Sequence, residues 1–193
     1  MKKLLLAAAV STSLLGACAS SMNQPMASSS SLLSAPMVGG AAMFASKDII
    51  DNAVNSRDHT TLVAAVKAAG LVDTLKSAGP FTVFAPTNAS FAALPAGTVD
   101  TLLKPENKSM LSNVLTYHVV PGRIDSAALA QQIRAGNGRA LLKTASGGTR
   151  VATMSGSNVL ISDAKGGSAT VTIADVYQSN GVIHVVNKVL LPG

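Results

Sequence analysis

The sequence is poor in the residues on which several classes of protein depend. Its 193 residues include one cysteine and no tryptophan, and only 3% are aromatic and 12% charged. A single cysteine excludes an internal disulfide and a Cys-x-x-Cys redox or zinc site. Scarce aromatics and singly scattered basic residues argue against a nucleic-acid surface, so we expect no nucleic-acid partner. Hydrophobic residues make up 48%, which is enough to bury a core.

The N-terminus has the pattern of a secretory signal. Met1-Lys2-Lys3 is followed by 12 uncharged residues, mostly Leu, Ala and Val, at positions 4–15. This run is shorter than the roughly 20 residues that span a bilayer as a helix. It has the length of the apolar region of a signal peptide, about 7–15 residues.

The only cysteine, Cys18, follows Leu15-Gly16-Ala17 and resembles the modified position of a bacterial lipoprotein signal. The resemblance implies that residues 1–17 are a lipoprotein signal peptide and that Cys18 is acylated, which makes the membrane the first expected partner. The residue after the cysteine is Ala19 and not Asp. By resemblance to lipoprotein sorting in bacteria with two membranes, this favours anchoring in the outer membrane of the cell envelope. The alternative is ordinary cleavage after Ala19, which gives a secreted or periplasmic soluble protein.

Two regions follow the predicted signal. Residues 18–46 are rich in Ser, Ala and Met and have no charged side chain and no lasting period, which is typical of a flexible tether. Residues 47–193 then form one predicted domain.

The domain changes its hydrophobic period halfway, which predicts an α+β fold. Its first half has apolar residues at helical spacing, with one strand at residues 81–84. We expect helices to begin at Asp58, at Thr87 or Asn88, at Pro105 and at Asp125. The first of these should end at Gly70 and the last at Gly136. The second half has short apolar runs between Gly-, Ser- and Asn-rich turns, which favours antiparallel strands. The last run, residues 182–191, is apolar on both faces and should be a central strand.

Three segments together resemble the fasciclin-like domain family. They are GPFTVFAPTNASFAAL (residues 79–94), LTYHVVPG (115–122) and NGVIHVVNKVLLP (180–192). The resemblance implies helices packed on an antiparallel β-wedge, in secreted or surface-anchored proteins that mediate adhesion. Asn88 and Asn187 stand where the family often has Asp, which bears on any role that needs a carboxylate there.

Tyr117 and His118 are the candidate binding residues, because the resemblance links this segment to integrin binding in animal members. The alternative is that both are buried and that the histidine bonds backbone groups. We expect His184 to be structural and His59 to be exposed without a role. The three histidines have no metal-ligand spacing, so we expect no metal and no cofactor.

No catalytic motif is present, so we expect a protein that is not an enzyme. The sequence has no G-x-S-x-G, H-E-x-x-H or phosphate-binding loop. We expect a membrane-anchored adhesion or binding module that contacts a protein, glycan or matrix. One alternative is a periplasmic carrier of a small apolar ligand, and another is a hydrolase whose acidic groups converge only on folding.

Overall fold

The computed structural model of the protein describes residues 35–192. The predicted signal peptide and Cys18 lie outside the described residues. The described helices are α1 (Ile49–Ala53), η1 (Arg57–His59), α2 (Thr60–Ala69), α3 (Val72–Lys76), α4 (Asn88–Ala92), α5 (Thr98–Leu103), η2 (Pro105–Asn107), α6 (Lys108–Tyr117) and α7 (Ser126–Ala135). The strands are β1 (Met37–Val38), β2 (Ala41–Ala42), β3 (Phe81–Pro86), β4 (Val119–Pro121), β5 (Arg139–Lys143), β6 (Thr149–Ser155), β7 (Asn158–Ser162), β8 (Ser168–Gln178) and β9 (Gly181–Val186).

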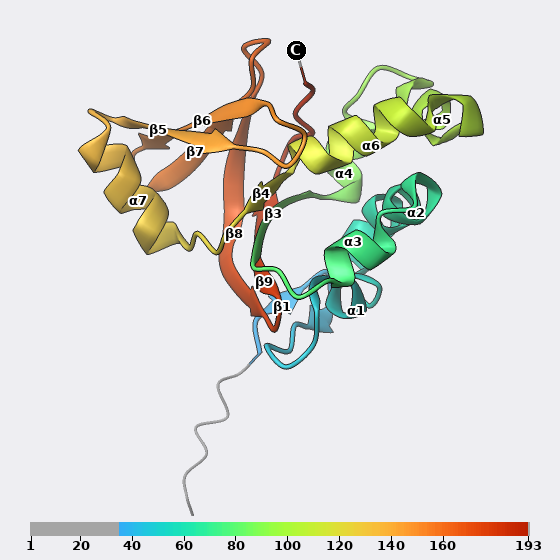
Figure 1. The fold of residues 1–193 in the computed structure, drawn as a ribbon, viewed down its shortest axis with the longest axis horizontal. Helices are drawn as coiled ribbons and strands as arrows, with labels where there is room; N and C mark the ends of the chain where they lie inside the picture. Colours follow the sequence, from blue (N-terminus) through green and yellow to red (C-terminus); the bar gives the residue numbers. More distant parts are fainter. Residues whose placement is uncertain (1–34, 193) are drawn as a thin grey trace, which may run out of the picture. The chain divides into compact units, whose positions relative to one another are not determined.

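A seven-stranded sheet in the order β4-β3-β9-β8-β7-β6-β5 organises the domain. Every neighbouring pair is antiparallel except β3 and β9, which run parallel. Helices α1 to α6 lie on one side of the central strands, and α7 lies with β5, β6 and β7 on the other side (Figure 1). This is the α+β fold that the sequence predicts.

The apolar run near the C-terminus forms a central strand, as predicted. All six residues of β9 are buried, and the strand lies between β3 and β8. Gly181 begins it at a close backbone approach, since a Cβ atom there would lie 2.1 Å from the carbonyl oxygen of Phe81. A larger residue at this position would push β9 away from β3.

Two hydrophobic clusters lie on the two sides of the sheet because residues alternate along each strand. Val83 and Ala85 of β3 belong to the cluster under the helices, whereas Phe84 belongs to the other. Leu129 and Ile133 of α7 cover this second cluster. Helix α7 thus packs on the sheet through one narrow apolar face.

The folded domain begins before the predicted boundary at residue 46. Residues 37–42 form the β1–β2 hairpin, and Val38 and Met43 are buried in the helical core. The Asn52 side chain holds this segment, because it accepts from the Phe44 amide at 3.0 Å and donates to the Phe44 carbonyl at 2.8 Å. The tether prediction was therefore too long at its C-terminal end. Strands of two residues leave no readable period, which is why the pattern missed them.

Most of the predicted helix caps are confirmed. Asp125 accepts from the Ala128 amide at the start of α7, and Thr87 caps α4 in a reciprocal capping box with Ser90. Gly70 and Pro105 also take their predicted places. The prediction for Asp58 was wrong: it lies within η1, and α2 starts without a side-chain cap.

Candidate functional site

His118 lies between α6 and β4 and is 3% exposed. Its Nδ1 lies 2.8 Å from the Val114 carbonyl oxygen, and its Nε2 lies 3.1 Å from the Leu190 amide nitrogen. The Leu190 amide can only donate, so the ring is neutral with its proton on Nδ1. Burial, and then the charge of Arg150, hold the pKa of His118 well below its usual value. The ring thus joins α6 to the segment that follows β9.

Tyr117 is 2% exposed, and its hydroxyl donates to the Thr149 carbonyl at 3.1 Å. Gly148 packs so closely on its ring that a Cβ atom there would lie 2.7 Å from Cε2. The burial of both Tyr117 and His118 favours their structural alternative over contact with a partner.

Arg150, which the sequence analysis did not single out, is the most unusual residue of this core. Its side chain is fully buried, and none of its three guanidinium nitrogens has a hydrogen-bond partner among the described residues. The guanidinium carbon lies 4.5 Å from the centre of the Tyr117 ring and 5.6 Å from that of Phe84, so it contacts two aromatic faces, and the Asp163 carboxylate also attracts its charge. Burial lowers the pKa of Arg150 to about 10.

The prediction that His59 is exposed was wrong. The ring is 3% exposed, and its Nδ1 lies 2.8 Å from the Ser56 hydroxyl. Nε2 has no hydrogen-bond partner among the described residues, while the charge of Asp58 and then the Ala85 carbonyl act to raise the pKa of His59. Burial is the larger effect and lowers the pKa of His59. The error followed from Asp58, which was expected to start the helix.

The N-terminus of α7 gathers a serine, an aspartate and a histidine that are far apart in sequence. Asp175 accepts from both the amide and the hydroxyl of Ser126. It sits at an irregularity of β8 with a φ of 59°. His184, the structural histidine of the sequence analysis, accepts from the Asp175 amide and contacts the Ile124 carbonyl at 2.8 Å.

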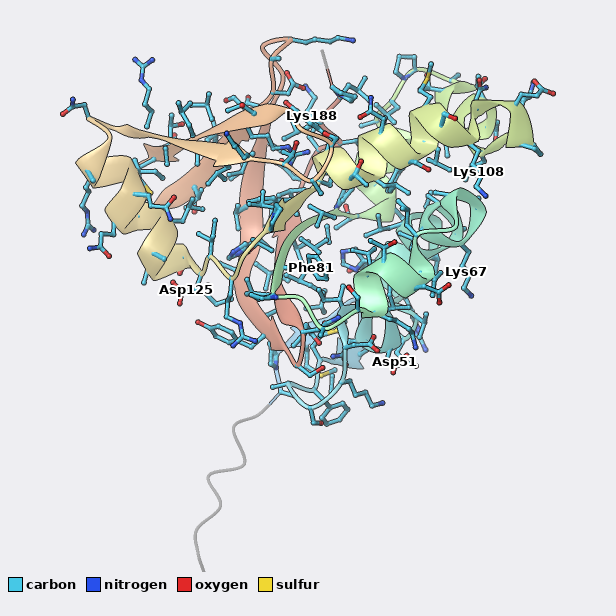
Figure 2. All side chains as sticks on the ribbon, viewed as in Figure 1. Asp51, Lys67, Phe81, Lys108, Asp125 and Lys188 are labelled. Atoms are coloured by element: carbon cyan, nitrogen blue, oxygen red, sulfur yellow. The ribbon has the colours of Figure 1, made fainter. Side chains whose placement is uncertain are left out.

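This cluster is a helix cap and not a catalytic triad. The imidazole bonds only backbone groups, and the serine hydroxyl donates to the Asp175 carboxylate and not to a histidine that could act as its base. Two carboxylates, Asp125 and Asp175, instead meet the positive end of the helix dipole. Figure 2 shows Asp125 at this end of α7.

Asn88 and Asn187, the two asparagines singled out in the sequence, both form hydrogen bonds within the fold. The Asn88 amide accepts from the Thr61 backbone and donates to the Arg57 carbonyl and the Thr60 hydroxyl. A carboxylate could not make the two donated bonds. Asn187 accepts from the Thr170 amide at 2.8 Å.

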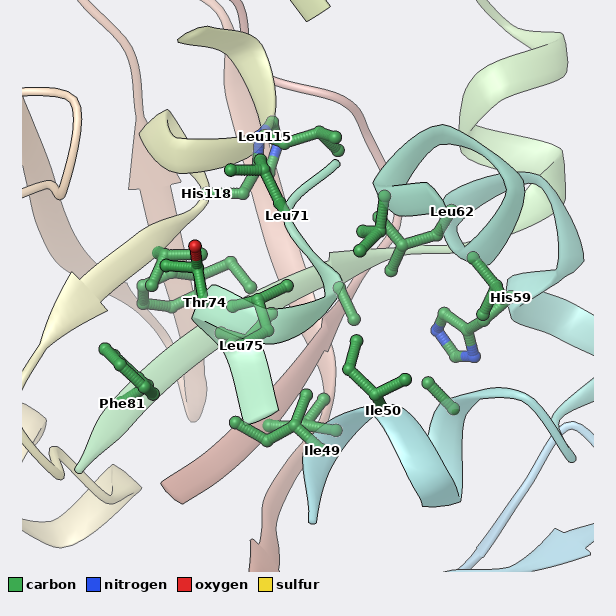
Figure 3. A pocket seen from close by; sticks show the side chains of 18 of the residues that line it. Ile49, Ile50, His59, Leu62, Leu71, Thr74, Leu75, Phe81, Leu115 and His118 are labelled. Carbon is green, nitrogen blue, oxygen red and sulfur yellow. The ribbon is translucent and has the colours of Figure 1, made fainter. Parts of the chain in front are cut away.

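An apolar cavity of about 80 Å³ lies between the helices and the sheet. In Figure 3, His59 and Leu115 lie at different sides of this cavity, and Ile49 and Ile50 lie on a third side. Pockets for drug-sized ligands measure about 300–1,000 Å³, so this cavity holds only a few carbon atoms without opening.

The described residues show no group of three or more His, Cys, Asp or Glu that could hold a metal ion. Among the helices that the structure describes, none combines the length and the apolar character needed to cross a bilayer.

Comparisons with known proteins agree with this architecture. The model of the Fasciclin domain matches residues 57–192. Protein sll1483 of Synechocystis is 48% identical over 160 residues, which cover 81% of this chain and 79% of the relative. The cell surface glycolipoprotein MPB83 of Mycobacterium bovis is 31% identical over 163 residues, which cover 80% of this chain and 64% of the relative. A solved FAS1 domain pair from the insect cell adhesion molecule Fasciclin I superposes with a TM-score of 0.53 at 22% identity, over 67% of this chain and 43% of that one.

Proposed function

The chain belongs to the fasciclin domain family, and on that premise we propose that it is a membrane-anchored binding module outside the cytoplasm. It adheres to a protein, glycan or matrix partner and catalyses no reaction. Support comes from the relative MPB83, whose name describes a cell surface glycolipoprotein. The predicted lipid on Cys18 gives this chain the same kind of attachment.

The observation that carries the proposal is the use of reactive side chains inside the fold. His118 and His184 bond backbone groups, His59 pairs with Ser56, and Asp125 and Asp175 cap α7. Recognition is therefore left to the surface. That surface carries large apolar side chains in the open, including Met37 at 61%, Met110 at 58% and Leu141 at 68% exposure.

Fractionation of a two-membrane bacterium that produces the full chain tests the anchor. We expect the wild type in the outer-membrane fraction, with the mass of an acylated N-terminus at residue 18. The Cys18→Ser variant should move to the soluble envelope fraction or the medium. A wild-type protein with an intact thiol would contradict the anchor.

Adhesion is tested with beads that carry the purified chain. We expect saturable retention on immobilised envelope or matrix fractions, lost on beads that carry the chain unfolded by urea. Many copies on one bead raise weak single contacts, as many copies in a membrane would. Equal retention of folded and unfolded chains would contradict a folded binding surface.

The cavity favours a second candidate, a periplasmic carrier of a small apolar ligand. Its lining is apolar, but its volume of about 80 Å³ limits the cargo. Native mass spectrometry of the protein from its host tests this candidate. A co-purifying mass of a small hydrocarbon-like molecule would support it, and a single ligand-free mass together with no response to added benzene would exclude it.

A further inference from the structure

The net positive charge of the described domain lies in its second half, residues 118–192. Residues 35–117 carry 6 Lys and Arg and 6 Asp and Glu, whereas residues 118–192 carry 7 basic and 3 acidic residues. Between Ser126 and Ser162 there is no acidic residue at all. Three basic residues of that stretch, Arg134, Arg139 and Lys143, are exposed. Exposed cations without acidic neighbours attract an anionic partner.

These cations lie along α7 and the edge strand β5. β5 ends the sheet and pairs only with β6. Its exposed face presents Arg139, Leu141 and Lys143, while Ala140 and Leu142 point inward. Leu141 is 68% exposed, more than any other large apolar side chain of the described residues. The edge therefore displays an apolar side chain between two cations.

The backbone of this edge is open along its middle. The Arg139 amide donates to the Gly136 carbonyl and the Ala145 amide donates to the Val119 carbonyl of β4. Amides of alternate residues point the same way, so those of Leu141 and Lys143 also point away from β6. Within residues 35–192, nothing bonds the backbone of either residue on that side. An unpaired edge of this kind is a template for an additional strand.

A shallow, open groove lies beside the same edge, between the end of α7 and the start of β5. Its lining residues are Gln132, Ala135, Gly136, Arg139, Ala140 and Leu141. Figure 1 shows α7 and β5 next to each other at the end of the sheet farthest from helices α1 to α6. A strand added to β5 would thus lie beside a groove and not against a closed wall.

We propose that β5 binds an extended acidic peptide segment of a partner protein, which joins the sheet as an extra strand. Backbone bonds to Leu141 and Lys143 hold the segment. Side chains of an antiparallel strand face their neighbours directly, so acidic residues at alternate positions pair with Arg139 and Lys143, and an apolar residue between them packs on Leu141. This deepens the proposed function, because it names the chemistry of the protein partner.

Fluorescence anisotropy with the full chain, in detergent where it is acylated, tests the proposal. The probe is a labelled nine-residue peptide with Glu, Val and Glu at alternate central positions and Thr between them. We expect saturable binding that weakens with added salt. Lys in place of both Glu residues should weaken binding at least about tenfold. The same loss is expected when the peptide amides that face the edge are methylated, a change that keeps the charge and removes the backbone donors.

Variants of the protein separate this edge from the rest of the surface. Arg139→Glu with Lys143→Glu should weaken binding at least about tenfold. Leu141→Pro should do the same, because proline removes an outward amide and is tolerated on edge strands. The matched control is Lys67→Glu with Lys104→Glu, which makes the same charge change in the helical half and should leave affinity within about twofold.

Three results would overturn the proposal: equal binding by the β5 and control variants, equal binding of the methylated peptide, or tighter binding of the acidic polysaccharide hyaluronate than of the peptide. None of them depends on the lipid anchor or on bead adhesion. A bound peptide with no bead adhesion would instead contradict only the proposed function.

Discussion

Replacement of the buried Arg150 by methionine should stabilise the domain. Burial lowers the pKa of Arg150 from its usual value to about 10, which corresponds to about 3–4 kcal/mol of unfavourable burial of the cation, at about 1.4 kcal/mol per pH unit. Methionine has a similar length, needs no hydrogen bond and keeps the contacts with Phe84 and Tyr117. The cation–π attraction that is lost amounts to about 1 kcal/mol per ring, or about 2 kcal/mol for Phe84 and Tyr117 together. We expect a net gain of about 1–2 kcal/mol, within the range measured when buried charges are replaced by apolar residues.

Urea unfolding of the wild type and Arg150→Met, followed by circular dichroism, measures this difference. The folded state binds the Arg150 proton less tightly than the unfolded state, so the energetic penalty of burying the cation is complete below pH 10 and fades as the pH rises above 10. The advantage of the variant should therefore shrink above pH 10. Arg139→Met, on the exposed face of β5, is the control and should change stability by less than about 0.5 kcal/mol. A loss of 2 kcal/mol or more in Arg150→Met would refute the reasoning, because it would mean that the guanidinium has a bonded partner in solution.

Four further predictions concern the core and the caps. Burial lowers the pKa of His59, His118 and His184, so the unfolded state takes up protons first as the pH falls through about 6.5, and the free energy of unfolding should decrease below that pH. Urea titrations at several pH values should show a smaller decrease of the unfolding free energy with falling pH in His118→Gln than in the wild type. Equal pH dependence of the two proteins would contradict a neutral His118 ring. Gly181→Ala should destabilise the domain by at least about 3 kcal/mol in urea titration because its Cβ meets the Phe81 carbonyl, whereas the neighbouring exposed Ser179→Ala should have almost no effect. Asp175→Ala should cost about 1–2 kcal/mol through lost capping of α7, with faster amide exchange at Ser126 as the specific sign and unchanged exchange as the contrary result. Tyr117→Phe should keep bead adhesion, and its free energy of unfolding should fall by only about 1 kcal/mol because the hydrogen bond to the Thr149 carbonyl is lost. Loss of adhesion by a fully folded variant would instead show that Tyr117 contacts the partner.

Local signals in the sequence were enough to predict much of the fold. Asp125 and Thr87 cap their helices because short polar side chains satisfy free amides wherever a helix begins. β9 was predicted to be central because a strand that is apolar on both faces must be covered on both. These properties depend on a few neighbouring residues, so they can be read from the chain alone.

Features that depend on distant contacts could not be predicted in this way. The parallel pairing of β3 with β9 joins residues about 100 positions apart, and nothing local distinguishes it from an antiparallel pair. Arg150 was overlooked because it looks like one of many scattered cations. The alternation of β6 does place it on the same face as the buried Ala152, and that signal could have found it. The edge of β5 became visible only when the strand order was known.

The place of β9 also bears on how the protein is made. β9 follows β3 and β8 in the chain, so these two strands lack their shared neighbour until residues 181–186 have been made. Nascent polypeptide lacking residues 181–186 has two open sheet edges and an uncovered helical layer. During export N-terminus first, the sheet could therefore close only after residues 181–186 have crossed the membrane, and until then the chain is unfolded and exposed to proteases and aggregation.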